Sequence, residues 1–282
     1  MKTYLSRFNR YFLLMSLLLT APAIRADVAV LIHGYLADSA AWEYSGVMPM
    51  LSTQGWQPAG TWVPGPEGMV PVTNPQVVAA KANKVYTVNL PAEAPIAVQA
   101  NYLRPILTLV SQRHPTEPMF LIGHSAGGVV ARFVLVTQPL ANVKALITIA
   151  SPHSGTGRAE QALDVANAVP FPFSIMADAL SGGTYGLLRD SRGLYLDLVR
   201  PYPGSFLGWL NLQPHPDLQY ISIVRSSPFM FGGDYVVPSY SQDMNNVPAL
   251  QGKAKTIIAN TGHELHPDDG IALAKIMADL KR

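Results

Sequence analysis

The clearest chemical signal in the chain is a serine flanked by glycines, in the order Gly123-His124-Ser125-Ala126-Gly127. The apolar run at 118–122 indicates a buried strand, and the apolar residues that follow the motif recur at helical spacing. A serine at a sharp turn between strand and helix exposes its hydroxyl beyond the sheet edge, and the two glycines let strand and helix approach closely. The N–H of Ala126, at the start of the helix, can then donate to a developing oxyanion. The pattern predicts a nucleophilic serine, and its alternative is a chance glycine-rich turn.

A serine hydroxyl is a weak nucleophile at neutral pH and needs a base beside it. Histidine is the one side chain whose unperturbed pKa suits that task, and a carboxylate must fix its tautomer and stabilise the imidazolium. If Ser125 is a nucleophile, the chain must therefore bring one histidine and one carboxylate to it.

Three stretches of the chain resemble segments of the α/β-hydrolase superfamily, and within it the bacterial lipases and esterases. They are V-A-V-L-I-H-G-Y (28–35), G-H-S-A-G-G (123–128) and I-A-S-P-H-S-G (149–155). The order and spacing of elements agree from about residue 27 to the C-terminus, whereas 156–215 matches no known segment. The resemblance implies a mostly parallel, doubly wound sheet with helices on both faces.

The resemblance also implies roles for single residues. The residue after His33-Gly34 supplies the second oxyanion donor, which here is the N–H of Tyr35, although H-G is also an ordinary strand-end turn. The base follows the last strand, at His263, with His266 as the alternative. His153 comes too early for the order serine, acid, histidine, and it is expected in a loop at the pocket rim. His33 and His124 are expected to be structural or to line the site.

The acid is the hardest member to place, because three aspartates lie near the strand that ends at Arg225. Asp217 precedes that strand and would emerge at the wrong end of a parallel sheet. Asp243 lies in a polar run that could be a solvated loop. Asp234 follows the strand by a short loop, and G-D-x-x-V-P looks like the acid loop of related lipases. The alternative for Asp234 is a turn aspartate bonded to its own backbone.

The hydrophobic pattern supports the same fold independently of the resemblance. Continuous apolar runs predict strands buried on both faces, and they alternate with helical patterns as in a doubly wound sheet. The expected strands are 28–32, 84–90, 118–122, 143–150, 218–225 and 255–259, and the expected helices are 39–51, 94–113 (kinked at Pro105), the one after Ser125, and 271–280. The Gly/Pro-rich stretch 58–75 is expected to be an irregular excursion near the site mouth.

Residues 156–215 interrupt this rhythm with apolar residues at 160–169, 171–188 and 206–210. The superfamily places a cap or lid after the strand that carries Ser151-Pro152-His153. We therefore expect a cap that covers an acyl-binding pocket, and an ordinary helical insertion is the alternative.

The N-terminus has the layout of a secretory signal peptide over residues 1–26. Lys2, Arg7 and Arg10 precede an apolar run at 11–19 that is short for a transmembrane helix, and small residues follow. The mature chain would begin at Ile24 or Asp27, and an uncleaved anchor is the alternative. Loss of the three basic residues leaves 17 basic against 18 acidic side chains. This near-neutral balance does not indicate a protein that binds nucleic acid.

The predicted function is a secreted or periplasmic serine carboxylic ester hydrolase that uses Ser125, Asp234 and His263, with a small-molecule or lipid ester as substrate. The chain has no cysteine, so cysteine nucleophiles and disulfides are excluded. No cofactor is expected. Some related lipases bind calcium near the histidine loop, but Asp268-Asp269 would open a helix and is expected to cap it, so no metal is expected. The alternatives are a phospholipase or acyltransferase with the same triad, and a non-catalytic binding protein.

Overall fold

The computed structural model describes residues 26–65, 68–72, 82–168, 178, 181–226 and 234–280, which form one layered α/β fold around an eight-stranded sheet. The strand order is β3-β2-β4-β1-β5-β6-β7-β8, and every neighbouring pair is parallel except β2 and β3. The strands are β1 (Val28–Ile32), β2 (Trp56–Gly65), β3 (Gly68–Val72), β4 (Asn83–Val88), β5 (Met119–His124), β6 (Val143–Ile149), β7 (Gln219–Arg225) and β8 (Ala254–Ala259).

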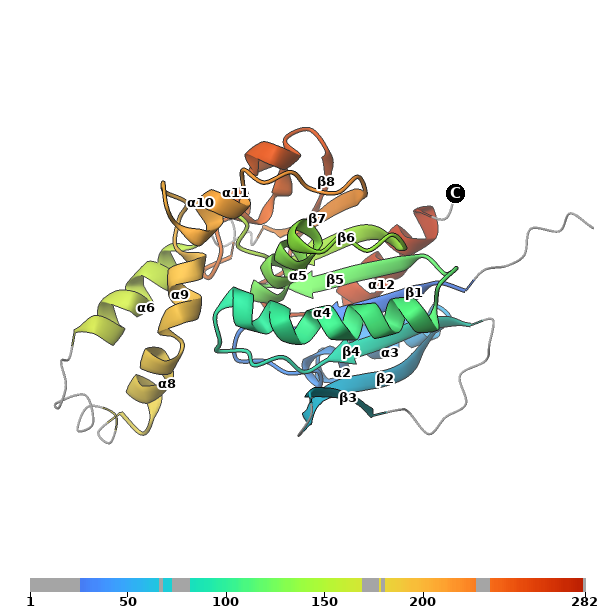
Figure 1. Ribbon diagram of the computed structural model, residues 1–282, viewed down its shortest axis with the longest axis horizontal. Helices are drawn as coiled ribbons and strands as arrows, with labels where there is room; N and C mark the ends of the chain where they lie inside the picture. The colour runs from blue at the N-terminus through green and yellow to red at the C-terminus, as the bar shows by residue number, and fades with distance from the viewer. Residues whose placement is uncertain are drawn as a thin grey trace, which may run out of the picture.

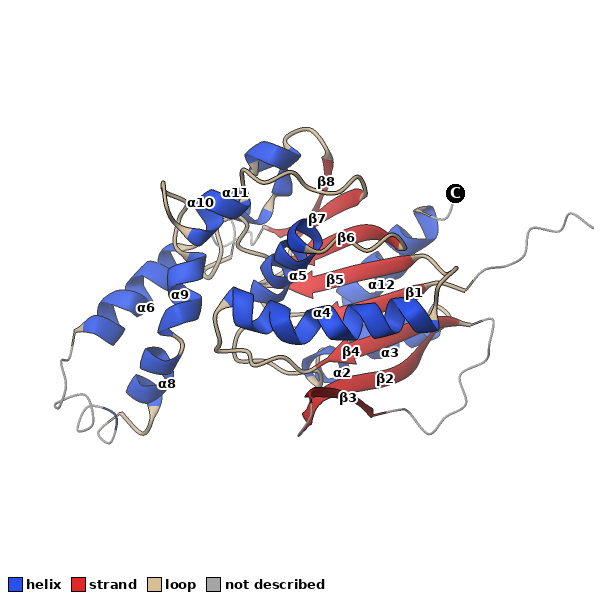
Figure 2. Cartoon of the chain, in the orientation of Figure 1, coloured by secondary structure: helices blue, strands red, loops and turns tan. Residues whose placement is uncertain are grey.

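Helices cover both faces of this sheet, as Figures 1 and 2 show. Alternate residues of β1 pack on opposite sides: Val28 and Val30 contact the cluster that includes α4 and α5, and Ala29 and Leu31 contact the cluster that includes α3 and α12. The predicted doubly wound, mostly parallel sheet is therefore confirmed. These helices are α2 (Ala41–Tyr44), α3 (Val47–Thr53), α4 (Ile96–Arg113), α5 (Ala126–Thr137), α11 (Ser239–Gln242) and α12 (Pro267–Asp279).

Two expectations about local structure are wrong. The stretch 58–75 was expected to be irregular, but its described part forms β2 and β3, an antiparallel pair at the sheet edge. Pro58 fits in β2 because it lies at a bulge in the pairing with β4, where a missing N–H is tolerated. The single helix expected over 39–51 is instead α2 and α3, divided at Gly46, whose φ of 81° is outside helical geometry.

The described part of the insertion 156–215 is helical and lies beyond the carboxyl ends of the strands, at the left of Figure 1. Its helices are α6 (Gly157–Asn167), α8 (Thr184–Asp190), α9 (Arg192–Leu198) and α10 (Phe206–Leu210). Residues 169–177 and 179–180 lie outside the described part, as do residues 1–25 of the predicted signal peptide. Among the described helices, none has the length and apolar character needed to span a bilayer.

Buried histidines make the stability of this fold sensitive to acid. Burial lowers the pKa of His33, His114, His124 and His153, and partial burial lowers the pKa of His215. Between their lowered pKa values and about 6.5, the unfolded chain binds protons that the folded chain does not, so stability falls as the pH falls through this range. Asp197 acts in the opposite direction, because burial raises its pKa to about 6.

We expect the free energy of unfolding to decrease from about pH 7.5 to about pH 5, by up to about 1.4 kcal/mol per pH unit for each histidine that titrates only when unfolded. Urea unfolding followed by tryptophan fluorescence at the two pH values measures this difference. Equal stability at both would contradict the burial of neutral histidines.

Candidate active site

Ser125 lies at the sharp turn between β5 and α5. Its φ of 51° and ψ of −128° are unusual for a residue with a side chain, so the turn is strained. The two glycines are required by close contact. A Cβ at Gly123 would lie 2.4 Å from the Cα of Gly128, and one at Gly127 would lie 2.2 Å from the carbonyl oxygen of His33. The sequence G-x-S-x-G is therefore the local requirement for β5, α5 and the loop after β1 to meet at Ser125.

The structure brings His263 and Asp234 to this serine. His263 Nε2 lies 3.0 Å from Ser125 Oγ, and its Nδ1 lies 2.9 Å from Asp234 Oδ2. All three residues are more than nine-tenths buried, with exposed fractions of 8%, 8% and 7% for Ser125, His263 and Asp234. The carboxylate accepts from Nδ1–H, so Nε2 is left to accept the serine proton. This is the geometry of a nucleophile, a general base and an orienting acid.

Each oxygen of Asp234 has its own set of donors. Oδ1 accepts from the amides of Val236 (2.8 Å) and Val237 (2.5 Å), which is the backbone-bonded turn that the sequence also allowed. Oδ2 accepts from His263 and from Nε2 of Gln242 at 3.1 Å. Burial alone would raise the pKa of Asp234, but the bonds from His263 and the two amides outweigh it and lower that pKa. The carboxylate is therefore held ionised beside the imidazole.

The other candidates for acid and base lie elsewhere. Asp243 accepts from the amide of Asn245 at 2.9 Å and begins the short 3-10 helix Met244–Asn246. Asp217 lies at the opposite end of the sheet, in a groove with Glu117 and Lys144. His266 is the N-cap of α12. None of these three is bonded to Ser125 or His263 in the hydrogen bonds of the described residues.

His153 was expected at the pocket rim, and that expectation is wrong. The side chain is fully buried, its Nε2 lies 3.1 Å from the hydroxyl of Thr148, and burial lowers its pKa well below the usual value. The residue belongs to a buried loop, which its amide anchors by donating to the carbonyl of Ser241 at 2.9 Å.

The two predicted oxyanion donors flank the serine. Ala126 is the first residue of α5, where backbone N–H groups have no partner within the helix. Tyr35 follows Gly34, which packs so closely on the serine that a Cβ there would lie 2.8 Å from Ser125 Cβ. His33 holds the peptide between Gly34 and Tyr35.

The bonds of His33 define its tautomer. The amide of Leu90 donates to Nε2 at 2.9 Å, so Nδ1 carries the hydrogen and donates to the Gly34 carbonyl at 2.9 Å. That carbonyl shares a planar peptide with the N–H of Tyr35, so fixing one fixes the direction of the other.

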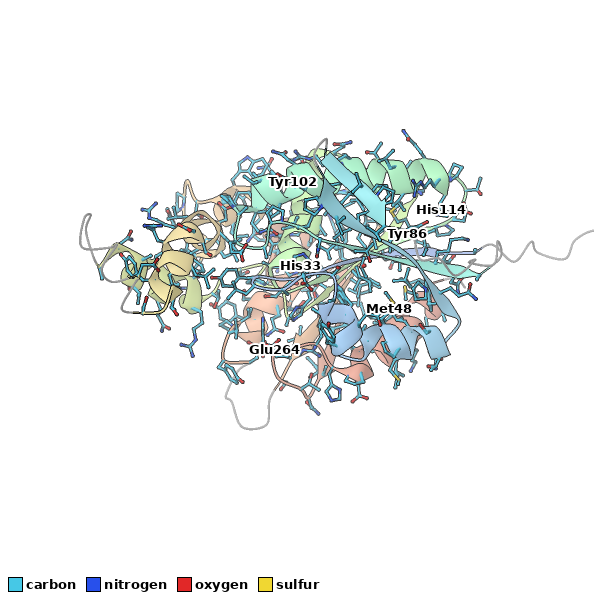
Figure 3. All side chains as sticks on the ribbon, turned by 90° about the horizontal axis from the view of Figure 1, so that it is seen from below. His33, Met48, Tyr86, Tyr102, His114 and Glu264 are labelled. Carbon is cyan, nitrogen blue, oxygen red and sulfur yellow. The ribbon has the colours of Figure 1, made fainter. Side chains whose placement is uncertain are left out.

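Figure 3 shows His33 and Glu264 toward the side of the molecule where the insertion helices lie, and Tyr86 and His114 together near the other end.

Two buried residues support the histidine loop: His124, which was expected from the sequence to be structural or to line the site, and Arg225, which was not identified from the sequence. His124 lies 2.9 Å from the carbonyl of His263 and donates to it through Nε2, and burial lowers the pKa of His124 to about 3, so the ring is neutral. Arg225 forms a two-pronged ion pair with Asp269, at 2.8 and 2.7 Å, and donates to the carbonyl of Glu264 at 3.1 Å. An arginine at the end of an apolar run is a signal that the sequence offered, but the sequence does not show which residues it binds.

Asp269 has the capping role expected at the start of α12. Its carboxylate accepts from the amide of His266 at 2.8 Å as part of a capping box, in addition to its ion pair with Arg225. In the part of the chain that the structure describes, no group of three histidine, aspartate or glutamate side chains is arranged to hold a metal ion.

Gln242 links the acid to the sheet. Its Oε1 accepts from the amide of Arg225 at 2.7 Å, while its Nε2 donates to Asp234 and to the carbonyl of Val237 at 2.7 Å.

We expect Gln242→Leu to lower the turnover number about tenfold, because Asp234 loses a hydrogen bond and the groups that Gln242 bound stay buried. Steady-state kinetics measures the effect, with Gln251→Leu, a substitution at an exposed glutamine, as the control. Turnover equal to that of the control would show that Asp234 needs no such support.

A cleft of about 570 Å³ opens at Ser125. Its walls are largely apolar, and among the lining residues that the structure describes the one acidic side chain is Glu264, directly after the histidine. None of the described residues of the insertion is among these lining residues, and Ser191 of the insertion contacts the cleft residue Tyr35. The lining residues are Tyr35, Leu36, Ala37, Ala41, Tyr44, Ser45, His124, Ser125, Val236, His263, Glu264 and Leu265.

Comparison with known proteins places the fold of this chain among known folds. Residues 94–169, which include β5, Ser125, α5 and β6, match the PGAP1-like alpha/beta domain family. No curated protein matches the chain.

Solved structures resemble it over most of its length, at low sequence identity. A gene product of Listeria innocua superposes with a TM-score of 0.54 at 13% identity, covering 91% of each chain. The mature form of Bacillus licheniformis lipase BlEst2 gives 0.52 at 15% identity, covering 92% of this chain and 93% of the lipase. A metagenomic carboxyl esterase, MGS0156, gives 0.53 at 15% identity, covering 91% of this chain and 76% of the esterase. The sheet order and these likenesses show that the chain has the α/β-hydrolase fold.

Proposed function

We propose that this protein is a serine hydrolase of carboxylic esters, of the lipase or esterase kind. The observation that carries the proposal is the pair of hydrogen bonds that joins Ser125 to His263 and His263 to Asp234. The serine hydroxyl lies at an apolar cleft. An isolated serine–histidine contact could be structural. A strained serine and a histidine oriented by a buried carboxylate together match the nucleophile, base and acid that acyl transfer needs, and the N–H groups of Tyr35 and Ala126 are the proposed oxyanion donors.

In the proposed reaction, Ser125 Oγ attacks the ester carbonyl as its proton passes to His263 Nε2. The resulting oxyanion accepts from the N–H groups of Tyr35 and Ala126. His263 then returns the proton to the alcohol oxygen as the ester bond breaks, which leaves an acyl-enzyme. Water attacks the acyl-enzyme with His263 as base, and the collapse of the second tetrahedral intermediate releases the carboxylic acid and restores Ser125.

The cleft supports a neutral ester with an apolar part as substrate. Leu36, Ala37, Ala41, Tyr44 and Leu265 offer contacts to an acyl or alkyl chain, and Leu36 (54%) and Tyr44 (90%) are exposed at its edge. An exposed apolar edge beside a cleft is suited to contact with a lipid interface. The proposal therefore includes contact of this edge with a lipid interface, and a role for the insertion as a cap over the substrate site.

Hydrolysis of p-nitrophenyl esters of increasing chain length, with and without an emulsion interface, tests the function. We expect turnover that saturates with substrate and is lost on treatment with a fluorophosphonate. Product analysis with an alcohol acceptor and with a phospholipid distinguishes hydrolase from acyltransferase and phospholipase. A folded protein that neither hydrolyses esters nor reacts with the fluorophosphonate would instead be a binding protein.

We also propose export through a cleaved signal peptide at residues 1–26, which is supported by the basic and apolar order of the N-terminus. N-terminal sequencing of protein recovered outside the cytoplasm should give Ile24 or Asp27 as the first residue. Recovery there with Met1 intact would contradict cleavage.

A further inference from the structure

The hydroxyl of Tyr35 is hydrogen-bonded to two hydroxyl groups of the insertion. Its phenol donates to Ser191 Oγ at 3.1 Å and is hydrogen-bonded to the phenol of Tyr195. The two rings also meet edge to face, with centroids 5.5 Å apart and planes at 76°. Ser191 and Tyr195 are both buried, at 0% and 6% exposure. We infer that Tyr195, on α9, is a positioning residue for the oxyanion-stabilising amide of Tyr35; this inference rests on the proposed function.

Helix α9 is itself fixed to the rest of the molecule, so it can hold another group in place. Asp197 accepts from the amide of Ile96, at the start of α4, at 2.7 Å. The carbonyl of Leu198 accepts from the amide of Thr156 at 3.0 Å. Gly193 packs on Pro95 so closely that a Cβ there would lie 2.6 Å from the proline ring. Leu194 and Leu198 are buried in the core on the α4 and α5 side of the sheet.

The loop that carries Tyr35 has less support from its own residues. Leu36 is 54% exposed and has a φ of 54°, which is strained for a branched side chain. On one side of the Tyr35 amide, His33 holds the Gly34 carbonyl. On the other side, the phenol of Tyr35 is held by α9. The donor is therefore fixed between two attachments, one through the peptide and one through the side chain.

This attachment matters because an oxyanion donor must be aimed before the charge develops. Catalytic groups lose effect when they are displaced by fractions of an ångström from productive geometry. Tyr195 is not among the described residues that line the cleft, whereas its hydroxyl is hydrogen-bonded to Tyr35, so it acts through Tyr35 and not on the substrate. The insertion would then contribute to catalysis by orienting the amide of Tyr35.

Tyr195→Phe is the direct test, because it keeps the ring and its edge-to-face contact and removes only the hydroxyl. Tyr185→Phe is the matched control: Tyr185 is equally buried in the insertion, at 6%, and its hydroxyl donates to the carbonyl of Ala166 at 2.9 Å, away from the oxyanion loop. We expect Tyr195→Phe to lower kcat about tenfold with KM changed by less than about twofold, and Tyr185→Phe to change neither.

A second comparison separates aiming from general damage. The ratio of ester to thionoester turnover reports the oxyanion site, since sulfur accepts hydrogen bonds poorly. This ratio should fall in Tyr195→Phe and stay at the wild-type value in Tyr185→Phe. Amide hydrogen exchange of residues 33–37, measured by mass spectrometry, should become faster in Tyr195→Phe only. This measurement does not depend on enzymatic activity.

Two results in Tyr195→Phe would overturn the inference: an equal loss of ester and thionoester turnover, or unchanged amide hydrogen exchange at residues 33–37. The proposed function would still be supported in that case if Ser125→Ala had lost its activity. A wild-type protein that is inert to esters and to a fluorophosphonate would overturn the proposed function, and the catalytic role of Tyr195 with it.

Discussion

Ser125→Ala is expected to remove ester hydrolysis almost completely, with turnover reduced by about 10⁴- to 10⁶-fold, because the members of a triad act as a unit. The variant should fold normally. Serine and alanine both carry a Cβ, so the strain at a φ of 51° is unchanged by the substitution. Turnover on a short p-nitrophenyl ester, together with the melting temperature, measures both expectations.

Ser52→Ala is the control for that experiment. Ser52 lies on α3, where its hydroxyl donates to the carbonyl of Met48 at 3.0 Å, away from the cleft. It should keep wild-type turnover. If Ser125→Ala kept more than roughly a tenth of the activity, Ser125 would not be the nucleophile.

Asp234→Asn is expected to lower the turnover number by roughly 10²- to 10⁴-fold while the fold stays intact. The remaining amide oxygen can still accept from Val236 and Val237. The new amide nitrogen would then face two donors, His263 Nδ1–H and Gln242 Nε2, where the carboxylate oxygen accepted from both. His263 can avoid this conflict by moving its hydrogen to Nε2, which leaves no lone pair there for the serine proton.

Asp243→Asn is the matched control, since asparagine can cap the amide of Asn245 as aspartate does. It should keep turnover close to the wild-type value. A large loss in Asp243→Asn without one in Asp234→Asn would identify Asp243 as the acid and would conflict with the hydrogen bond between Asp234 and His263.

The fold could be predicted from the sequence because most of its strands are buried on both faces. Such strands are continuous apolar runs, and β1, β5 and β6 agree with the predicted ranges within a few residues. The β2–β3 pair could not be found in this way. Its glycines and prolines indicate a loop when pairing partners are unknown, and β4, which accommodates the bulge at Pro58, lies about 25 residues further along the chain.

The site could be predicted where a residue is fixed by its place after a strand. Ser125, Asp234 and His263 all follow strands whose carboxyl ends meet at one edge of the sheet, and the structure places them together. Gln242, Arg225 and Tyr195 could not be predicted, because each acts through a contact that forms only in the folded chain: Gln242 binds Asp234, 8 positions away, and Arg225 binds Asp269, 44 positions away. Tyr195 contacts a residue 160 positions earlier, and no local pattern indicates such a contact.

The most direct measurement of the proposed nucleophile is labelling by a fluorophosphonate followed by mass spectrometry of the peptides. The reagent forms a covalent phosphonyl ester only with a serine activated by its base and an oxyanion site. One label per chain is expected, on the peptide that contains Ser125, and Ser125→Ala should take up none. A folded wild-type protein that remains unlabelled, or that carries the label on another serine, would contradict the assignment of Ser125.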